Sequence, residues 1–347
     1  MGAKNMKVHE RIQELKSKFG DSLYIPAHHY QKDEIIQFSD SVGDSLELAK
    51  LAAKNKKADY IIFCGVHFMA ETAEILAEPH QKVFLPNFDA GCSMADMANL
   101  KQAKKSWAFL TEEFGESILP LTYVNSSASI KAFVGENQGA TVTSSNAKEM
   151  LAWAFKQKQR VLFLPDQHLG RNTAYSLGIS LNEMAVWDPE SELLEYSGDK
   201  NKIKIILWKG YCSVHLKFSV GDVKKAQLEG RKIIVHPECD FDVVQLADYN
   251  GSTNKIIKTI TESQAGSKWA IGTESNLVKR IIVNNPDKDI ISLNPVASYC
   301  ETMNQIKLPD LLLSLENIVN GNNNNQITVD KNIAKNARLA LNKMLSI

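Results

Sequence analysis

One unit of chain occurs three times in this sequence, and it constrains the fold more than any other feature. In its clearest copy an apolar run, residues 233–235, is long enough for a buried strand. The run ends at the HPE motif of residues 236–238, where proline stops the pairing of strands. A GST turn at residues 251–253 then precedes a helical pattern. The unit therefore joins the end of a strand to the start of a helix.

The other two copies follow the same order. The first leads from the apolar residues 24–27 to the helical pattern of residues 46–53, and the second leads from residues 118–122 to residues 146–155. The polar residues at the three strand ends are His28, Tyr30, Tyr123, Asn125, His236 and Glu238, and the hydroxyl residues at the three helix starts are Ser45, Ser144 and Thr253. An internal repeat of this kind predicts one structural unit used three times.

Short apolar runs alternate with helical patterns along most of the chain. The predicted strands are residues 24–27, 60–64, 82–85, 118–123, 140–143, 160–164, 232–235, 269–272 and 289–293. This alternation predicts an α/β fold with short parallel sheets covered by helices. We expect three αβα layers related by a pseudo-threefold axis, with one active site at the centre where the carboxyl ends of the strands meet.

The repeat also predicts three domains. The first comprises residues 1–95 together with about 305–347, the second residues 96–210, and the third residues 211–304. The tail is expected to be helical from residue 308, to break at the asparagine-rich residues 320–325, and to resume as a helix.

Composition excludes several classes of function. Forty basic residues balance forty acidic ones, so no positive field predicts binding to nucleic acid or to an anionic membrane. Apolar runs stay short of the roughly 18 residues of a membrane span, and the first residues lack a secretory apolar core. We expect a soluble, cytoplasmic protein.

Three of the five cysteines occupy equivalent places in the repeat. Cys92, Cys212 and Cys300 each follow the third strand of a unit, whereas Cys64 and Cys239 lie near earlier strand ends. Three thiolates at one centre favour zinc or an iron–sulfur cluster and leave one coordination position open. The alternative is that these cysteines are ordinary buried apolar residues.

The strand ends and helix starts suit acid–base chemistry and anion binding. Glu238 is the candidate general base, and His236 beside it can hold a substrate carboxylate or carry a proton. His28 and Tyr30 are candidates for further proton transfers. The three helix starts offer free N–H groups to anions. In the alternative interpretation, Ser45, Ser144 and Thr253 only cap their own helices.

The order of motifs resembles the quinolinate synthase family of bacterial de novo NAD biosynthesis. The similar stretches include AHHYQ, GDSLELA, GVHFMAET, AGCS, YVNSSASIKA, TSSNA, FLPDQHLGRN, GYCSVH, HPEC, GST and YCETM, which together cover about residues 20–315. The resemblance implies condensation of iminosuccinate with dihydroxyacetone phosphate to quinolinate, with release of phosphate and water. It also implies an enzyme of the transferase class and a functional link to L-aspartate oxidase.

The resemblance further implies a [4Fe–4S] cluster with three cysteine ligands and one open iron. By motif its ligands are Cys92, Cys212 and Cys300. The implied catalytic residues are Glu238, His236, Tyr30 and His28, and the implied substrate-binding residues are His28, Ser45, Tyr123, Asn125, Ser144, His236, Glu238 and Thr253. Some members carry a CxxCxxC motif near the C-terminus, which is absent around Cys300. An iron–sulfur sensor or electron carrier, and a zinc hydrolase on the same thiols, are the alternative functions.

Overall fold

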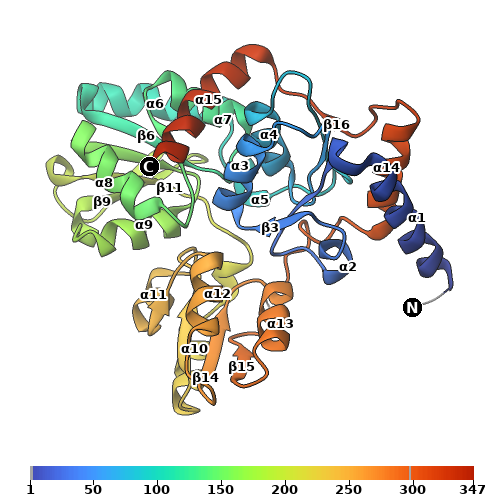
Figure 1. Ribbon diagram of the computed structural model, residues 1–347. Helices are drawn as coiled ribbons and strands as arrows, with labels where there is room; N and C mark the ends of the chain where they lie inside the picture. The colour runs from blue at the N-terminus through green and yellow to red at the C-terminus, as the bar shows by residue number, and fades with distance from the viewer. Residues whose placement is uncertain (1–2, 297) are drawn as a thin grey trace. The chain divides into compact units, whose positions relative to one another are not determined.

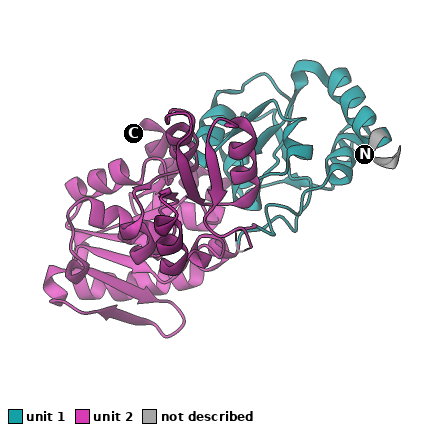
Figure 2. Cartoon of the chain, turned by 90° about the horizontal axis from the view of Figure 1, so that it is seen from below, with its two compact units in different colours: residues 1–92, 300–330 teal, residues 93–299, 331–347 magenta. Residues whose placement is uncertain are grey.

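The computed structural model describes residues 3–296 and 298–347, which form an α/β fold of short, mainly parallel sheets (Figure 1). The chain divides into two compact units (Figure 2). Unit 1 comprises residues 1–92 and 300–330, and unit 2 comprises residues 93–299 and 331–347. None of the helices in the described ranges combines the length and apolar composition that a membrane span requires.

Unit 1 contains a four-stranded sheet in the order β1-β4-β5-β16 and a separate parallel pair, β2 and β3. The strands are β1 (Leu23–Tyr24), β2 (Pro26–His28), β3 (Ser41–Gly43), β4 (Tyr60–Ile62), β5 (Lys82–Phe84) and β16 (Gln326–Ile327). The helices are α1 (Ala3–Phe19), α2 (Asp33–Ile36), α3 (Ser45–Lys54), α4 (His67–Leu76) and α14 (Leu308–Val319). In the four-stranded sheet β16 is antiparallel to β5, and the other pairs are parallel.

Unit 2 contains a six-stranded sheet in the order β10-β9-β11-β8-β6-β7. Its strands are β6 (Ile118–Tyr123), β7 (Ala140–Val142), β8 (Arg160–Leu164), β9 (Met184–Asp188), β10 (Leu193–Tyr196) and β11 (Ile205–Trp208). The helices around it are α5 (Ser93–Asp96), α6 (Leu100–Phe114), α7 (Ala128–Glu136), α8 (Ala147–Gln157), α9 (Gln167–Ser176) and α15 (Lys331–Ser346). The C-terminal helix α15 packs against α7 (Figure 1). Gly135 permits this close approach, because a Cβ there would lie 2.0 Å from the carbonyl oxygen of Asn336.

The second sheet of unit 2 has four parallel strands in the order β13-β12-β14-β15. Its strands are β12 (Lys232–Val235), β13 (Tyr249–Asn250), β14 (Lys268–Gly272) and β15 (Asp289–Ser292), and its helices are α10 (Val220–Leu228), α11 (Phe241–Leu246), α12 (Thr253–Thr261) and α13 (Ser275–Asn284). Helix α12 is strongly amphipathic, with Ile256 and Ile260 buried one turn apart. A short 3₁₀ turn, η5 (His215–Lys217), precedes α10.

The predicted α/β class with short parallel sheets is confirmed, and the predicted strands lie within one or two residues of the observed ones. One predicted strand, residues 24–27, divides at Ile25, so β1 pairs with β4 and β2 pairs with β3. The backbone N–H of Ile25 donates instead to Oδ2 of Asp40, at 2.7 Å. In the tail, β16 was not predicted, since two residues are too few for a periodic signal. The division into three domains stays a prediction.

Two copies of the repeat share an atomic arrangement at their strand ends. His28 ends β2, and its backbone N–H donates to the carbonyl of Cys64, 2.9 Å away. His236 follows β12, and its N–H donates to the carbonyl of Gly272 at 3.0 Å. In both, Nδ1 of the histidine accepts an N–H from the residue two positions later, Tyr30 at 3.2 Å and Glu238 at 3.4 Å.

The capping interpretation of the helix starts is wrong. Asp44, and not Ser45, caps α3, because its carboxylate accepts from the N–H groups of Leu46 and Glu47. Ser252, and not Thr253, caps α12 by accepting from the N–H of Lys255. Ser45 and Thr253 are therefore the first residues inside their helices.

Ser144 also fails to cap a helix. Helix α8 has Asn146 at its N-cap, without a capping bond from the side chain of that residue. Ser144 instead lies in the turn before Asn146. Helix propensity and hydroxyl chemistry allow several neighbouring residues to cap, and the backbone angles decide among them.

Candidate active site

Glu238 lies at the centre of a buried polar network in unit 2. It follows β12 in the HPE turn, and only 3% of its surface is exposed. Its Oε1 accepts a hydrogen bond from the hydroxyl of Tyr123, 2.5 Å away, and its Oε2 lies 2.7 Å from Nδ1 of His215. Tyr123 is the last residue of β6, so the network joins the two sheets of unit 2.

His215 extends the network beyond Glu238. Its Nε2 lies 3.2 Å from Oγ1 of Thr273, the residue that follows β14. The His215 ring also stacks on the ring of His236, with centroids 4.3 Å apart and planes inclined by 16°. Because both rings are buried, they have little freedom to reorient. Glu238 is thus surrounded by side chains whose positions are fixed.

The electrostatics of the network favour a charged carboxylate beside a neutral imidazole. Burial, together with neighbouring His215, lowers the pKa of His236 to about 3. For Glu238 burial alone raises the pKa, but the two histidines and the Tyr123 hydroxyl together bring it below the ordinary value. At neutral pH, therefore, Glu238 is ionised and His236 is uncharged. Since Nδ1 of His236 accepts an N–H, its proton lies on Nε2.

Asn172 on α9 holds the turn that carries Glu238. Its side-chain Nδ2 donates to the carbonyl oxygens of both Pro237 and Cys239, each at 2.9 Å. These two carbonyls flank Glu238 in the chain, and Asn172 is only 6% exposed. One amide group therefore fixes the backbone on either side of the carboxylate.

A second buried carboxyl group, that of Asp166, lies at the start of the same helix. It caps α9 by accepting from the N–H groups of His168 at 2.7 Å and Leu169 at 3.0 Å. Burial, and then the charge of Glu238, raise the pKa of Asp166 well above its ordinary value. Burial therefore favours the neutral form of Asp166, whereas the neighbours of Glu238 favour its ionised form.

A polar hollow of about 430 Å³ lies beside this turn in unit 2. It is lined by the residues before α8, among them Ser144 and Ser145, and by the residues before α12, among them Gly251 and Ser252. Pro237 and Asn172 also line it, together with residues of α8, α9 and α12. The hollow therefore places Ser144 and the start of α12 around one space, next to the HPE turn. Thr253, the residue after Ser252, is buried.

The remaining candidate residues belong to both units. Asn125 follows β6 in unit 2, and its Oδ1 is buried without a hydrogen-bond partner among the described residues. His28, Tyr30 and Ser45 belong to unit 1. There the ring of Tyr30 meets the ring of His28 edge-on, with centroids 4.5 Å apart. His28 is 4% exposed, whereas Ser45 is half-buried at the first position of α3.

The five cysteines fall into two classes. Cys64 and Cys239 are fully buried, and burial raises the pKa of the Cys64 thiol to about 12 and that of Cys239 well above its ordinary value. Both are therefore neutral thiols and poor metal ligands. Cys92, Cys212 and Cys300 are partly exposed. These three fit the donor set of a three-thiolate cluster, because their partial exposure leaves them accessible to metal.

Sequence reasoning missed three residues of the site. His215 lies three positions after Cys212 in the GYCSVH motif, and that spacing was the available signal. Thr273 follows β14 just as His236 follows β12, since Gly272 pairs with Val235 in the sheet. For Asn172 no local signal exists, because its two acceptors lie 65 and 67 residues away in the chain.

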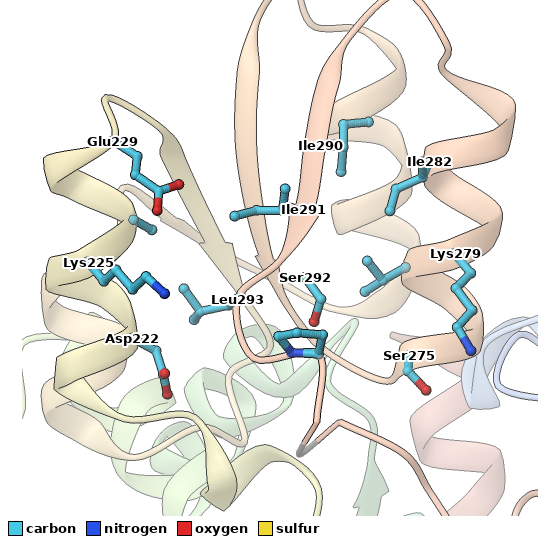
Figure 3. Close-up of a pocket in the computed structure, with 13 residues that line it drawn as sticks. Asp222, Lys225, Glu229, Ser275, Lys279, Ile282, Ile290, Ile291, Ser292 and Leu293 are labelled. Atoms are coloured by element: carbon cyan, nitrogen blue, oxygen red, sulfur yellow. The ribbon is translucent and has the colours of Figure 1, made fainter.

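A further hollow, of about 490 Å³, runs along the outer edge of β15 between α10 and α13 (Figure 3). Ile291 and Leu293 lie between Lys225 on one side and Lys279 on the other (Figure 3). The residues that line it include no histidine, cysteine or tyrosine.

The chain is similar to known proteins over nearly its whole length. The model of a protein family described as "Quinolinate synthetase A protein" matches residues 10–346. The chain is 60% identical to a quinolinate synthase of Geobacillus sp. (strain WCH70), over 100% of this chain and 95% of that protein. It is 62% identical to a quinolinate synthase of Bacillus licheniformis, over 97% of this chain and 92% of the relative. These similarities do not favour the alternative of an iron–sulfur sensor or electron carrier.

Proposed function

The chain belongs to the quinolinate synthetase A protein family, and from this premise we propose that it condenses iminosuccinate with dihydroxyacetone phosphate to form quinolinate, phosphate and water. One observation carries the proposal to specific residues: the buried, ionised carboxylate of Glu238, held between Tyr123 and His215. A condensation of this kind needs a base beside a carbonyl group, and Glu238 has the charge and the fixed position for that role.

His236 holds a substrate carboxylate in this proposal. Its imidazole is neutral, with Nδ1 accepting from the N–H of Glu238 and the proton on Nε2. An Nε2–H group donates a hydrogen bond to an anion without adding charge. His28 in unit 1 has the same Nδ1 arrangement with Tyr30, so the two histidines have equivalent donors. We assign His28 and Tyr30 to the later proton transfers that close the ring.

The anionic groups of the substrates bind at the helix starts. Ser144 and the turn before α12 line the polar hollow together, and helix starts are suited to anions. Thr253 and Ser45 occupy the first positions of their helices, at the positively polarised end of the helix dipole. Asn125, whose Oδ1 is buried without a partner among the described residues, supplies an acceptor for an N–H group of the substrate. Tyr123 and Glu238 complete the set.

A [4Fe–4S] cluster bound by Cys92, Cys212 and Cys300 is part of the proposal. It is supported by the partial exposure of these three thiols and by the burial of the other two. Cys92 and Cys300 lie at two of the three points at which the chain passes between unit 1 and unit 2. When bound, such a cluster supplies a Lewis acid at its open iron. From the same family membership we also propose the transferase class, a functional link to L-aspartate oxidase and a cytoplasmic location.

An anaerobic assay of quinolinate from the two substrates tests the proposal. We expect the wild-type chain to form quinolinate and Glu238→Gln to lose roughly 10²- to 10⁴-fold in kcat, the usual contribution of a general base. Glu262→Gln is the matched control, because that carboxylate is exposed on α12's C-terminal side and pairs only weakly with Lys258. If Glu238→Gln kept wild-type kcat, the base assignment would be wrong. If the wild type formed no quinolinate, the activity itself would be wrong.

A further inference from the structure

Three side chains of unit 2 bring a thiol, an imidazole and a carboxylate to one place. Cys212, His215 and Glu238 each offer one ligand atom, and these atoms all lie within 4.8 Å of one another. His215 and Glu238 are buried, and Cys212 is partly exposed. We propose that the cluster-free chain binds a single divalent metal ion of the zinc type at these three residues. The set shares only Cys212 with the three-cysteine cluster site.

The ligand types favour zinc and similar ions. Thiolate, imidazole and carboxylate are all zinc ligands, and three protein ligands leave the fourth tetrahedral position to water. Ligand atoms about 2.0–2.3 Å from a tetrahedral zinc lie roughly 3.3–3.6 Å apart. The 2.7 Å contact between His215 Nδ1 and Glu238 Oε2 must therefore widen slightly. Rotation of the partly exposed Cys212 side chain closes the longer separations.

Groups that orient the ligands are already present. Thr273 Oγ1 lies 3.2 Å from Nε2 of His215, and the Tyr123 hydroxyl donates to Oε1 of Glu238. A hydroxyl both donates and accepts, so Thr273 can accept an Nε2–H after the metal has taken Nδ1. In that step the imidazole proton moves from Nδ1 to Nε2, the Cys212 thiol loses its proton to solvent, and Sγ, Nδ1 and Oε2 bind the ion. Such outer partners stabilise metal-bound histidine and carboxylate.

The single ion and the cluster exclude one another, because both need the Cys212 sulfur. The inference does not rest on the proposed reaction, since a lone metal ion at this place requires neither substrate nor turnover. It does imply that zinc delays cluster assembly in the full chain. It also implies that Glu238 is no longer available as a base while the ion is bound.

Metal titration of the cluster-free full chain tests the inference. The protein is prepared without oxygen and treated with a chelator, and Co²⁺ and then Zn²⁺ are added against a competing chromophoric chelator. We expect one tight site with a thiolate-to-cobalt charge-transfer band. Cys212→Ser should abolish the band. Loss of an outer partner lowers metal affinity roughly 10- to 100-fold, and His215→Gln, which removes a ligand, should lower it by more than that. Thr273→Val, which keeps all three ligands, should weaken binding within that 10- to 100-fold range.

Two further variants separate this site from the cluster site. Cys92→Ser and Cys300→Ser should keep wild-type affinity for zinc while losing the ability to assemble a cluster from iron and sulfide. If either variant weakened zinc binding as much as Cys212→Ser does, the ion would be held by the three thiolates and the inference would be overturned. Unchanged zinc affinity in His215→Gln, or no tight site in the wild type, would overturn it as well. Circular dichroism of each variant establishes that it is folded.

Discussion

The hydroxyl of Tyr123 donates a hydrogen bond to Oε1 of Glu238, 115 residues further along the chain. Tyr123 ends β6 of the six-stranded sheet, and Glu238 follows β12 of the neighbouring four-stranded sheet. Two copies of the repeat therefore meet at one carboxylate. Burial raises the pKa of Glu238, and the hydrogen bond from Tyr123 helps to lower it.

Tyr123→Phe should lower kcat/KM by roughly 10- to 200-fold, because a hydrogen bond to a charged group contributes about 1.5–3 kcal/mol. Losing the hydroxyl also raises the pKa of Glu238, so the acid side of the pH–kcat/KM profile should move to higher pH. Tyr196→Phe, at an exposed position of β10, is the control and should behave as wild type. An unshifted profile in Tyr123→Phe would exclude Glu238 as the group that titrates.

Asn172→Ala should reduce kcat about 10- to 100-fold while KM changes little, because the turn around Glu238 loses the donor that holds both of its carbonyls. Two buried acceptors without a donor should also lower the free energy of unfolding by about 1–3 kcal/mol each. The exposed Asn201→Ala serves as control. Kinetics are measured well below the unfolding temperature of the variant. A purely structural role would lower stability and leave kcat unchanged.

Replacing Ser252 by alanine should affect stability, whereas replacing Thr253 by alanine should affect catalysis. Ser252→Ala removes the cap of α12 and should cost about 1 kcal/mol in the free energy of unfolding. Thr253→Ala leaves the cap in place, so we expect little loss of capping energy but a roughly 10- to 200-fold lower kcat/KM. Urea unfolding and steady-state kinetics on the same preparations compare the two. Wild-type kcat/KM in Thr253→Ala would remove Thr253 from the anion site.

Replacement by alanine should remove bound iron at three of the cysteines and leave it unchanged at the other two. Alanine at Cys92, Cys212 or Cys300 should abolish the bound iron and sulfide and the brown colour of the anaerobic protein. Alanine at Cys64 or Cys239 should leave both unchanged, because those thiols are buried and neutral. Iron and sulfide analysis of the five variants makes the comparison. Iron lost from Cys64→Ala at unchanged stability would contradict the assignment.

His236 should make stability depend on pH. Its folded-state pKa is lowered to about 3, whereas an unfolded histidine titrates near 6.5. Below about pH 6.5 the unfolded chain therefore binds a proton that the folded chain rejects, and stability falls by up to roughly 1.4 kcal/mol per pH unit. Between pH 6.5 and 5, His236→Gln should lose less stability than wild type in urea unfolding. Equal losses would mean that His236 is not buried in its neutral form.

The sequence determined the local elements and the repeat. Apolar runs of the right length predicted nine strand segments, and polar residues follow where these buried runs end. The GST turn likewise marked the start of α12 correctly. These features depend on neighbours within one or two helical turns, which a sequence displays directly.

Only the tertiary structure decided which side chains surround Glu238. Tyr123, His215 and Thr273 come from three separate segments, and Asn172 comes from a fourth. Such contacts depend on how two sheets pack, and packing energy is shared among many residues with no local pattern. The capping residues were likewise decided by backbone angles at each turn, which is why Asp44 and Ser252 cap their helices while the adjacent Ser45 and Thr253 do not.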